Sequence, residues 1–411
     1  MASAPGASQR LRVAVLGYVV RGPLGGLAWH HLQYVVGLVR LGHDVFFLED
    51  SEDYEACYDP VTDRMGSDPS YGLGFAERTF REVGLGERWA YHDAHTGTWH
   101  GPCAGRVAEI CATSDLLLNL SGSNPLRPSL QTIPVRVFVD TDPVFTQIKH
   151  LTRPADHELA AAHNRFFSLA ENIGRPSCQI PSDGFPWRPT RQPVVTDMWR
   201  PTPGRPSAPF TTVMQWDSYE IRELAGVRYG MKSASFTPYL DLPRRLGRWS
   251  FELAIGANIA TRELLEAHGW GVIDPRRPTR TIGSFQQYLR GSRAEFSVAK
   301  HGYVVARSGW FSERSTGYLA SGRPVVVQDT GFSDWLSTGR GVLAFDDADG
   351  AMAGIEALDR AYEWHCRAAR EVVEEYFSAP RVLSFLLERA LSAEQAPSPS
   401  DAKAPARGFH E

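Results

Sequence analysis

The sequence predicts an α/β protein with two Rossmann-like, doubly wound domains that face a central cleft. Its 411 residues exceed what one hydrophobic core usually supports, so we expect two domains. In both halves, apolar segments typical of buried parallel strands alternate with helical segments. The proline-rich stretch Arg188–Pro209 separates the halves, because dense proline disfavours both helix and sheet.

These patterns set the expected domain boundaries. We predict a flexible start over residues 1–10, a first Rossmann-like domain over 11–200 and a second over 201–375. A C-terminal helix over 376–391 follows. Residues 392–411 are rich in Ala, Pro and Ser and are predicted to form a disordered tail.

The composition limits which binding partners and which cellular location we expect for the protein. The net charge of −4 argues against a surface for nucleic acid or anionic membranes. No apolar run reaches the ~18 residues of a transmembrane helix, and the N-terminus lacks an apolar signal core. The five cysteines show no CxxC pair and no partner histidine spacing, so we expect reduced thiols in a cytoplasmic protein without a cysteine-based metal site.

The first half opens with a βαβ pattern. Its parts are a strand, a glycine-containing loop, a helix and a second strand, at Arg12–Leu16, Tyr18–Gly26, Leu27–Leu41 and His43–Leu48. The loop glycines do not spell the dinucleotide motif GxGxxG. Gly25 and Gly26 either let a ligand approach the backbone closely or make a tight turn.

Adjacent histidines lie near the start of this first helix. His30 and His31 must point in different directions, so one can face the cleft while the other faces sheet or solvent. A neutral imidazole near a helix N-terminus suits a general base. We take His30 as the candidate base, although an isolated histidine is more often structural.

An Asp-x-Asp motif, Asp140 to Asp142, closes the strand Val135–Val139. Some sugar transferases hold a divalent ion on a diphosphate with this motif, but it is short and arises easily by chance. We expect no metal here. Asp142 is predicted to bind the acceptor or to serve as an alternative general base.

The stretch Ser312–Gly331 carries the predicted donor site. Ser312 is a plausible N-cap, Gly322 suits a left-handed helix stop, and a strand at Val325–Val327 leads into a polar loop. A helix start with unpaired amides attracts phosphate, although an ordinary αβ unit gives the same pattern. Cations elsewhere in the second half can converge on a pyrophosphate or remain on the surface. The predicted donor-binding residues are Gly25, Gly26, Arg228, Lys232, Lys300, Ser312, Glu313, Arg314, Ser315, Thr316, Asp329 and Thr330.

The residues RLGHDVFFLED and GYLASGRPVVVQDTG together resemble glycosyltransferases of the two-Rossmann, B-type fold (GT-B). The second segment is similar to the EAMASGxPVV pattern of the large retaining group, which carries two Glu eight residues apart. Gly309 and Gly317 stand at those two positions here. The second Glu is expected to bind the donor ribose, and Glu313 or Asp329 could replace it. The resemblance also implies that the last helix crosses back to the first domain.

The resemblance implies a metal-independent glycosyltransferase with a nucleoside-diphosphate sugar, such as a UDP-sugar, as co-substrate and no further cofactor. The second domain would bind this donor, and the first a small-molecule, natural-product or glycan acceptor. Two alternatives remain open at this point. One is a UDP-GlcNAc-type epimerase on the same fold, and the other is an inactive nucleotide-sugar-binding protein.

Overall fold

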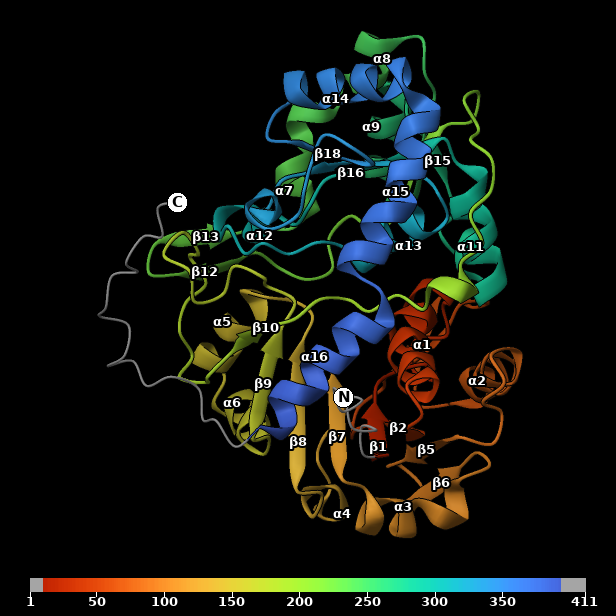
Figure 1. The fold of residues 1–411 in the computed structure, drawn as a ribbon, viewed down its shortest axis with the longest axis vertical. Coiled ribbons are helices and arrows are strands. Elements are labelled where there is room, and N and C mark those ends of the chain that lie inside the picture. The colour runs from red at the N-terminus through yellow and green to blue at the C-terminus, as the bar shows by residue number, and fades with distance from the viewer. Residues whose placement is uncertain (1–9, 393–411) are drawn as a thin grey trace, which may run out of the picture.

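We describe a computed structural model of the chain, over residues 10–392. The predicted flexible start and disordered tail lie almost entirely outside these residues. The fold has two α/β domains, each built on one mainly or wholly parallel sheet with helices on both faces, one above the other in Figure 1. The predicted fold class is therefore confirmed. No helix between residues 10 and 392 combines the length and apolar character needed to cross a membrane.

The first domain holds an eight-stranded sheet in the order β10-β9-β8-β7-β1-β2-β5-β6, in which β5 and β6 pair antiparallel and the other neighbours pair parallel. Its strands are β1 (Arg12–Leu16), β2 (Asp44–Asp50), β5 (Trp89–Asp93), β6 (Thr98–His100), β7 (Leu116–Leu120), β8 (Val135–Asp140), β9 (Arg165–Ser168) and β10 (Arg188–Pro189). A separate hairpin joins β3 (Cys57–Asp59) to β4 (Arg64–Gly66). The helices are α1 (Gly25–Arg40), α2 (Ser70–Glu82), α3 (Val107–Thr113), α4 (Pro128–Gln131), α5 (Phe145–Thr152) and α6 (Pro154–Ala161).

The second domain holds a parallel six-stranded sheet in the order β15-β14-β11-β16-β17-β18. Its strands are β11 (Phe210–Gln215), β14 (Phe251–Gly256), β15 (Gly271–Ile273), β16 (Ala294–Ser297), β17 (Val325–Gln328) and β18 (Val342–Phe345), beside a hairpin of β12 (Arg222–Leu224) and β13 (Val227–Tyr229). The helices are α7 (Lys232–Phe236), α8 (Leu242–Leu246), α9 (Ile259–Ala267), α10 (Arg276–Thr279), α11 (Ile282–Gly291), α12 (His301–Val305), α13 (Glu313–Ala320), α14 (Ala348–Arg360) and α15 (Tyr362–Tyr376).

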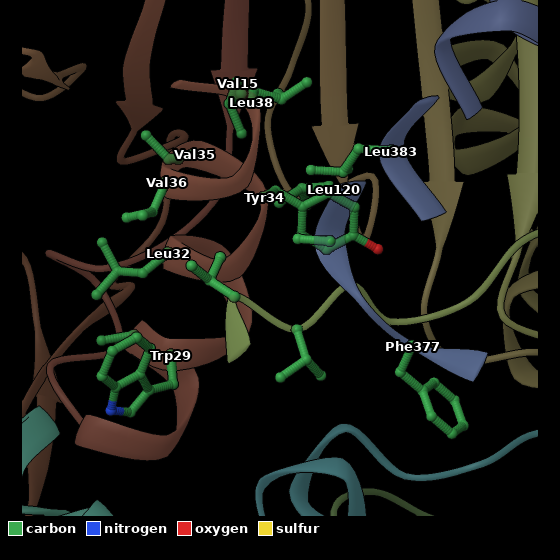
Figure 2. Packing of buried hydrophobic residues seen from close by; sticks show 14 of the residues in the cluster. Val15, Trp29, Leu32, Tyr34, Val35, Val36, Leu38, Leu120, Phe377 and Leu383 are labelled. Atoms are coloured by element: carbon green, nitrogen blue, oxygen red, sulfur yellow. The ribbon is translucent and has the colours of Figure 1, made fainter. Parts of the chain in front are cut away.

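The last helix, α16 (Ala379–Leu391), runs from the second domain down across the first (Figure 1). Leu383 packs so closely on α1 that a Cβ at Gly37 would lie 2.5 Å from its Cδ1. Figure 2 shows Leu383 in one buried cluster with Tyr34 and Leu38 of α1. The end of the chain therefore ties the two domains together.

Prolines lie at the starts of two helices. Pro243 lies in the first turn of α8. Pro380 lies in the first turn of α16, just after the break that follows α15. In both places the fixed backbone angle of proline starts a helix, since the first-turn amide needs no intrahelical partner.

Each sheet has a switch point where the strand order reverses, between β1 and β7 in the first domain and between β11 and β16 in the second. In open α/β sheets, ligands bind beyond the carboxyl ends of strands at such points. The loops after β1, β11 and β16 line one cavity between the domains. The fold therefore brings both expected ligand-binding edges to the same place.

Candidate donor site between the domains

A cavity of about 720 Å³ lies between the two domains. The first domain contributes the loop after β1, the start of α1 and the end of β8. The second contributes the ends of β11 and β16 and the start of α13. Two helix N-termini, each with positive partial charge, therefore border one space. A volume of this size fits a nucleotide-sized ligand.

A buried carboxylate holds the loop that forms the cavity's first-domain wall. Glu49, 1% exposed, accepts backbone N–H groups of Val19, Val20 and Arg21 at 2.7, 2.8 and 2.7 Å. These bonds satisfy amides that no strand or helix pairs, so the loop needs no regular structure. Glu49 was not among the predicted residues, although an acidic residue at a strand end is a recognisable signal.

The two loop glycines have different roles in the structure. A Cβ on Gly25 would lie 2.1 Å from the backbone oxygen of Thr281, so this glycine permits contact between α1 and the second domain. Trp29 adds to that contact by donating its indole N–H to Ile282 O at 3.0 Å. Gly26 lines the cavity. Gly26 is therefore the glycine that a ligand in the cavity could contact, whereas Gly25 allows the two domains to pack closely.

His30 and His31 point in different directions, as expected from adjacent helical positions. His31 is fully buried, accepts the Tyr18 N–H through Nε2 at 3.2 Å and donates from Nδ1 to Leu27 O at 2.8 Å. His30 lines the cavity, is 7% exposed, and neither of its ring nitrogens has a hydrogen-bond partner among the described residues. Burial lowers the pKa of His30, so its ring is neutral near pH 7.

The Asp-x-Asp carboxylates serve structural contacts. Asp140 is fully buried and accepts hydrogen bonds from Thr146, Ser168 and Gln147 side chains at 2.6 to 3.1 Å. Asp142 faces the second domain. Its Oδ1 accepts from Lys300 Nζ at 2.8 Å. In the part of the chain that the structure describes, no three His, Cys, Asp or Glu side chains gather as a metal site.

Lys300 and Asp142 join the two domains. Two tyrosine hydroxyls, from Tyr219 and Tyr303, also donate to the Asp142 carboxylate. The Lys300 ammonium lies 4.6 Å from the Tyr219 ring centroid, within cation–π range. Lys300 lines the cavity, but its charge is already matched by Asp142. The carboxylate in turn has its oxygens occupied, so it fits the role of general base less well than His30.

The start of α13 supplies part of the second-domain wall. Ser312 caps the helix and accepts the Arg314 N–H at 3.2 Å, and Ser312, Glu313 and Arg314 all line the cavity. The Arg314 guanidinium makes its hydrogen bonds within the second domain. It donates to Glu295 at 2.7 Å and to Val213 O and Ser297 Oγ on the sheet. The Glu313 carboxylate bonds to none of the described residues. It is therefore open to a ligand.

Six of the predicted donor-binding residues do not line this cavity, namely Gly25, which packs as described above, and Arg228, Ser315, Thr316, Asp329 and Thr330. Arg228 is exposed on the hairpin strand β13. Ser315 and Thr316 are each 1% exposed on the inner face of α13. The other two hold the loop after β17. Asp329 accepts the Gly331 N–H at 2.8 Å, and the Thr330 hydroxyl donates to Trp310 O at 2.6 Å.

Gly309 and Gly317, which stand at the expected Glu positions, are closely packed. A Cβ on Gly309 would lie 2.7 Å from Asn172 Cγ, and Gly309 has a φ of +73° that glycine adopts without strain. A Cβ on Gly317 would lie 3.2 Å from the Trp199 ring. Of the two suggested replacements for the ribose-binding Glu, Glu313 lies at the cavity and Asp329 does not.

Lys232 is the cavity-lining cation that lacks a partner among the described residues. Arg276 pairs with Asp274 at 2.6 Å, and Lys300 and Arg314 pair with the carboxylates described above. Lys232 forms no hydrogen bond or ion pair within residues 10–392. Burial and the nearby Arg314 and Lys300 charges lower its pKa to about 7. An anion in the cavity would relieve this crowding of positive charge.

Sequence reasoning missed the hairpin that covers the cavity. Tyr58, Asp63 and Met65, on or between β3 and β4, line the cavity from the first domain. Asp63 reaches the second domain, where its carboxylate lies 3.7 Å from the Arg276 guanidinium. The signal was weak because each strand has only three residues.

The arrangement of the two domains and the inter-domain cavity defines the B-type glycosyltransferase fold. Among solved structures, the chain is similar to an alpha-glucosyltransferase in complex with UDP and a 13-mer DNA containing a central A:G mismatch. The TM-score is 0.58, at 10% identity, over 93% of this chain and 100% of that one. It is also similar to Anabaena HepE in complex with UDP and glucose, with a TM-score of 0.51, 8% identity, and coverage of 92% and 99%.

Sequence comparison adds nothing to this likeness. No protein-family profile matches the chain, and no curated protein matches it in sequence. At identities this low, the structural likeness establishes the fold alone.

The unpaired Lys232 predicts how ligand affinity depends on pH. Its pKa near 7 in the free protein should rise when a diphosphate binds, because the anion favours the charged ammonium. Binding of UDP-glucose, whose diphosphate keeps its charge throughout, should therefore weaken as pH rises above about 7, by up to about tenfold per unit. Isothermal titration between about pH 6 and 9 measures this.

Lys232→Met should remove the pH dependence, and titration in buffers of different ionisation enthalpy should show proton uptake for the natural protein only. Arg228→Met, at an exposed position away from the cavity, is the matched control and should change neither quantity. An affinity that is independent of pH in the natural protein contradicts the assignment of Lys232 to the anion site.

Proposed function

We propose that the protein is a glycosyltransferase that moves a sugar from a nucleoside-diphosphate sugar, such as a UDP-sugar, to an acceptor hydroxyl without a metal ion. The observation that carries this proposal is the unpaired Lys232 in a cavity bordered by the starts of α1 and α13. Helix amides and an ammonium group stabilise the charge that builds on a departing diphosphate. The UDP bound in the two similar structures supports the nucleotide class.

The remaining residues at the cavity suit the other steps of transfer. Glu313, with a free carboxylate beside the helix start, is placed to bind the ribose hydroxyls of the donor. His30 lies on the facing wall as a neutral ring with unoccupied nitrogens, which suits removal of the acceptor proton. Two ion pairs, Lys300–Asp142 and Arg276–Asp63, connect the domains beside the cavity, and exclusion of water there would limit hydrolysis of the donor.

A thermal-shift screen against UDP-, GDP-, dTDP- and CMP-sugars tests the nucleotide class. One class should raise the melting temperature, since a ligand at ~100 times its dissociation constant adds ~2.7 kcal/mol of stability. Turnover of that donor should then require an acceptor. Epimerisation without an acceptor would instead favour the epimerase alternative. Binding without turnover across an acceptor panel would favour an inactive binding protein, and no shift with any sugar nucleotide contradicts the proposal.

Metal independence predicts that EDTA leaves initial transfer rates nearly unchanged, because Asp140 and Asp142 are occupied by protein donors. Rates are measured with and without EDTA, and then with added Mg²⁺ or Mn²⁺. A loss of rate that either ion restores would show that a metal takes part.

His30→Ala should lower the turnover number by about 10² to 10⁴, the usual contribution of a general base, while the donor dissociation constant stays near that of the natural protein. The ring makes no hydrogen bond, so folding should change little. Steady-state kinetics and donor titration give both quantities. A turnover number within a few-fold of the natural protein contradicts the role of His30.

His31→Ala should lower the turnover number much less than His30→Ala, because His31 does not line the cavity. It should cost stability, since it removes two hydrogen bonds and leaves a void under the loop after β1. The variant should therefore lower the free energy of unfolding, which denaturant titration measures for both histidine variants. Equal losses of stability would show that His30→Ala damages the helix rather than the chemistry.

A further inference from the structure

A second cavity of about 670 Å³ adjoins the first, on the side of the first domain. Tyr18, Gly22, Tyr58 and Met65 line both cavities, so a ligand in one lies next to a ligand in the other. Tyr219, whose hydroxyl bonds Asp142, lines only the second. None of the predicted site residues lies in this second cavity.

The second cavity contains a histidine held by a buried carboxylate. His150, 6% exposed, bonds Asp183 through Nδ1 at 2.7 Å, and Asp183 in turn accepts from the Trp187 indole at 2.8 Å. Because Nδ1 is bonded to Asp183, Nε2 is the ring nitrogen that remains for a ligand. No described residue bonds to this Nε2, and His150 lines the cavity. It is a polar group fixed in place and left free for a ligand.

The charged side chains of the second cavity are matched within the protein. Arg21 pairs with Glu52 at 2.9 Å, and Lys149 pairs with Asp156 at 2.8 Å. The other histidine at this cavity, His163, has both ring nitrogens in hydrogen bonds and a pKa lowered by burial to about 4. Among the described residues, the cavity therefore offers no unpaired cation for an anionic ligand. The donor cavity differs, because Lys232 is unpaired there.

The rest of the lining suits a hydroxylated compound. Aromatic rings and hydroxyl groups share the wall; they belong to Tyr18, Tyr54, Tyr58, Phe138, Ser121, Ser123 and Thr146. Aromatic faces cover the C–H faces of sugar rings, while hydroxyl groups exchange hydrogen bonds with sugar hydroxyls.

We propose that this second cavity holds the acceptor, that the acceptor is a neutral polyhydroxylated compound such as a glycoside, and that His150 Nε2 accepts a hydrogen bond from one of its hydroxyls. The proposal rests on the glycosyltransferase function proposed above. In the transfer, the bond from sugar C1 to the diphosphate oxygen breaks and a bond from C1 to an acceptor oxygen forms. The proton of that hydroxyl passes to His30, and the nucleoside diphosphate leaves. His150 binds a different hydroxyl and thereby positions the acceptor.

Nucleic acid is the contrasting acceptor, because DNA is present with one of the similar structures. Binding of DNA depends on cations that neutralise phosphates, and those of the second cavity are already paired. The chain's net charge of −4 also disfavours binding of DNA. A neutral acceptor needs no such cations.

The test uses the full-length protein with the sugar nucleotide that the thermal-shift screen selects. Neutral methyl glycosides and disaccharides, a sugar phosphate, glucuronate and duplex DNA are supplied as acceptors. Transfer should occur to neutral sugars only. His150→Asn keeps a donor for Asp183 but removes Nε2, and should raise the acceptor KM about tenfold with an unchanged donor dissociation constant. Tyr54→Ala, at a 55% exposed ring on the cavity wall, should also raise the acceptor KM.

His268→Asn is the matched control. His268 bonds Asp241 through Nδ1 at 2.7 Å, the same distance as in the His150–Asp183 pair, but it lies at the end of α9, outside both cavities. This variant should leave the acceptor KM unchanged. Transfer to DNA or only to anionic sugars, or an unchanged KM in both His150→Asn and Tyr54→Ala, overturns the proposal while the glycosyltransferase function stands. Failure to bind any sugar nucleotide is the distinct result that removes the proposed function itself.

Discussion

The ion pair between Asp142 and Lys300 sets the geometry on which both cavities depend. It joins the end of β8 in the first domain to the end of β16 in the second, at 2.8 Å. A partly buried pair of this kind is stable only when further donors compensate for lost hydration. The hydroxyls of Tyr219 and Tyr303 supply that compensation. Because these groups also line the cavities, this contact between the domains forms part of the wall between the two cavities.

Charge matching differs between the two cavities. Most cations that line the first cavity are paired with neighbouring carboxylates. Lys232 has no such partner among the described residues, its pKa is lowered, and a bound anion would stabilise its charged form. In the second cavity the pairs are complete, and the free polar group is a histidine acceptor. A charged diphosphate and a neutral acceptor would thus be sorted by electrostatics before any specific contact forms.

The fold could be predicted from the sequence because its strands are buried in parallel sheets and therefore read as apolar runs. The start of α13 was found through its capping serine, and Ser312 does cap that helix. The strand β16 was missed because it contains Glu295, a charged residue that is fully buried and paired with Arg314. Local pattern cannot reveal such a partner, since the two residues meet only in the folded protein.

The candidate site was harder to predict, because its residues come together only in the folded protein. Residues near a motif in sequence, such as Ser315 and Asp329, turn out to support the helix and loop that carry the site. His150 and Asp183, by contrast, are 33 residues apart and meet only in the folded chain. Gly309 and Gly317 are so closely packed that neither position has room for a carboxylate side chain without local shifts. The ribose contact that we propose is therefore assigned to Glu313, which lines the cavity one helical turn before Gly317.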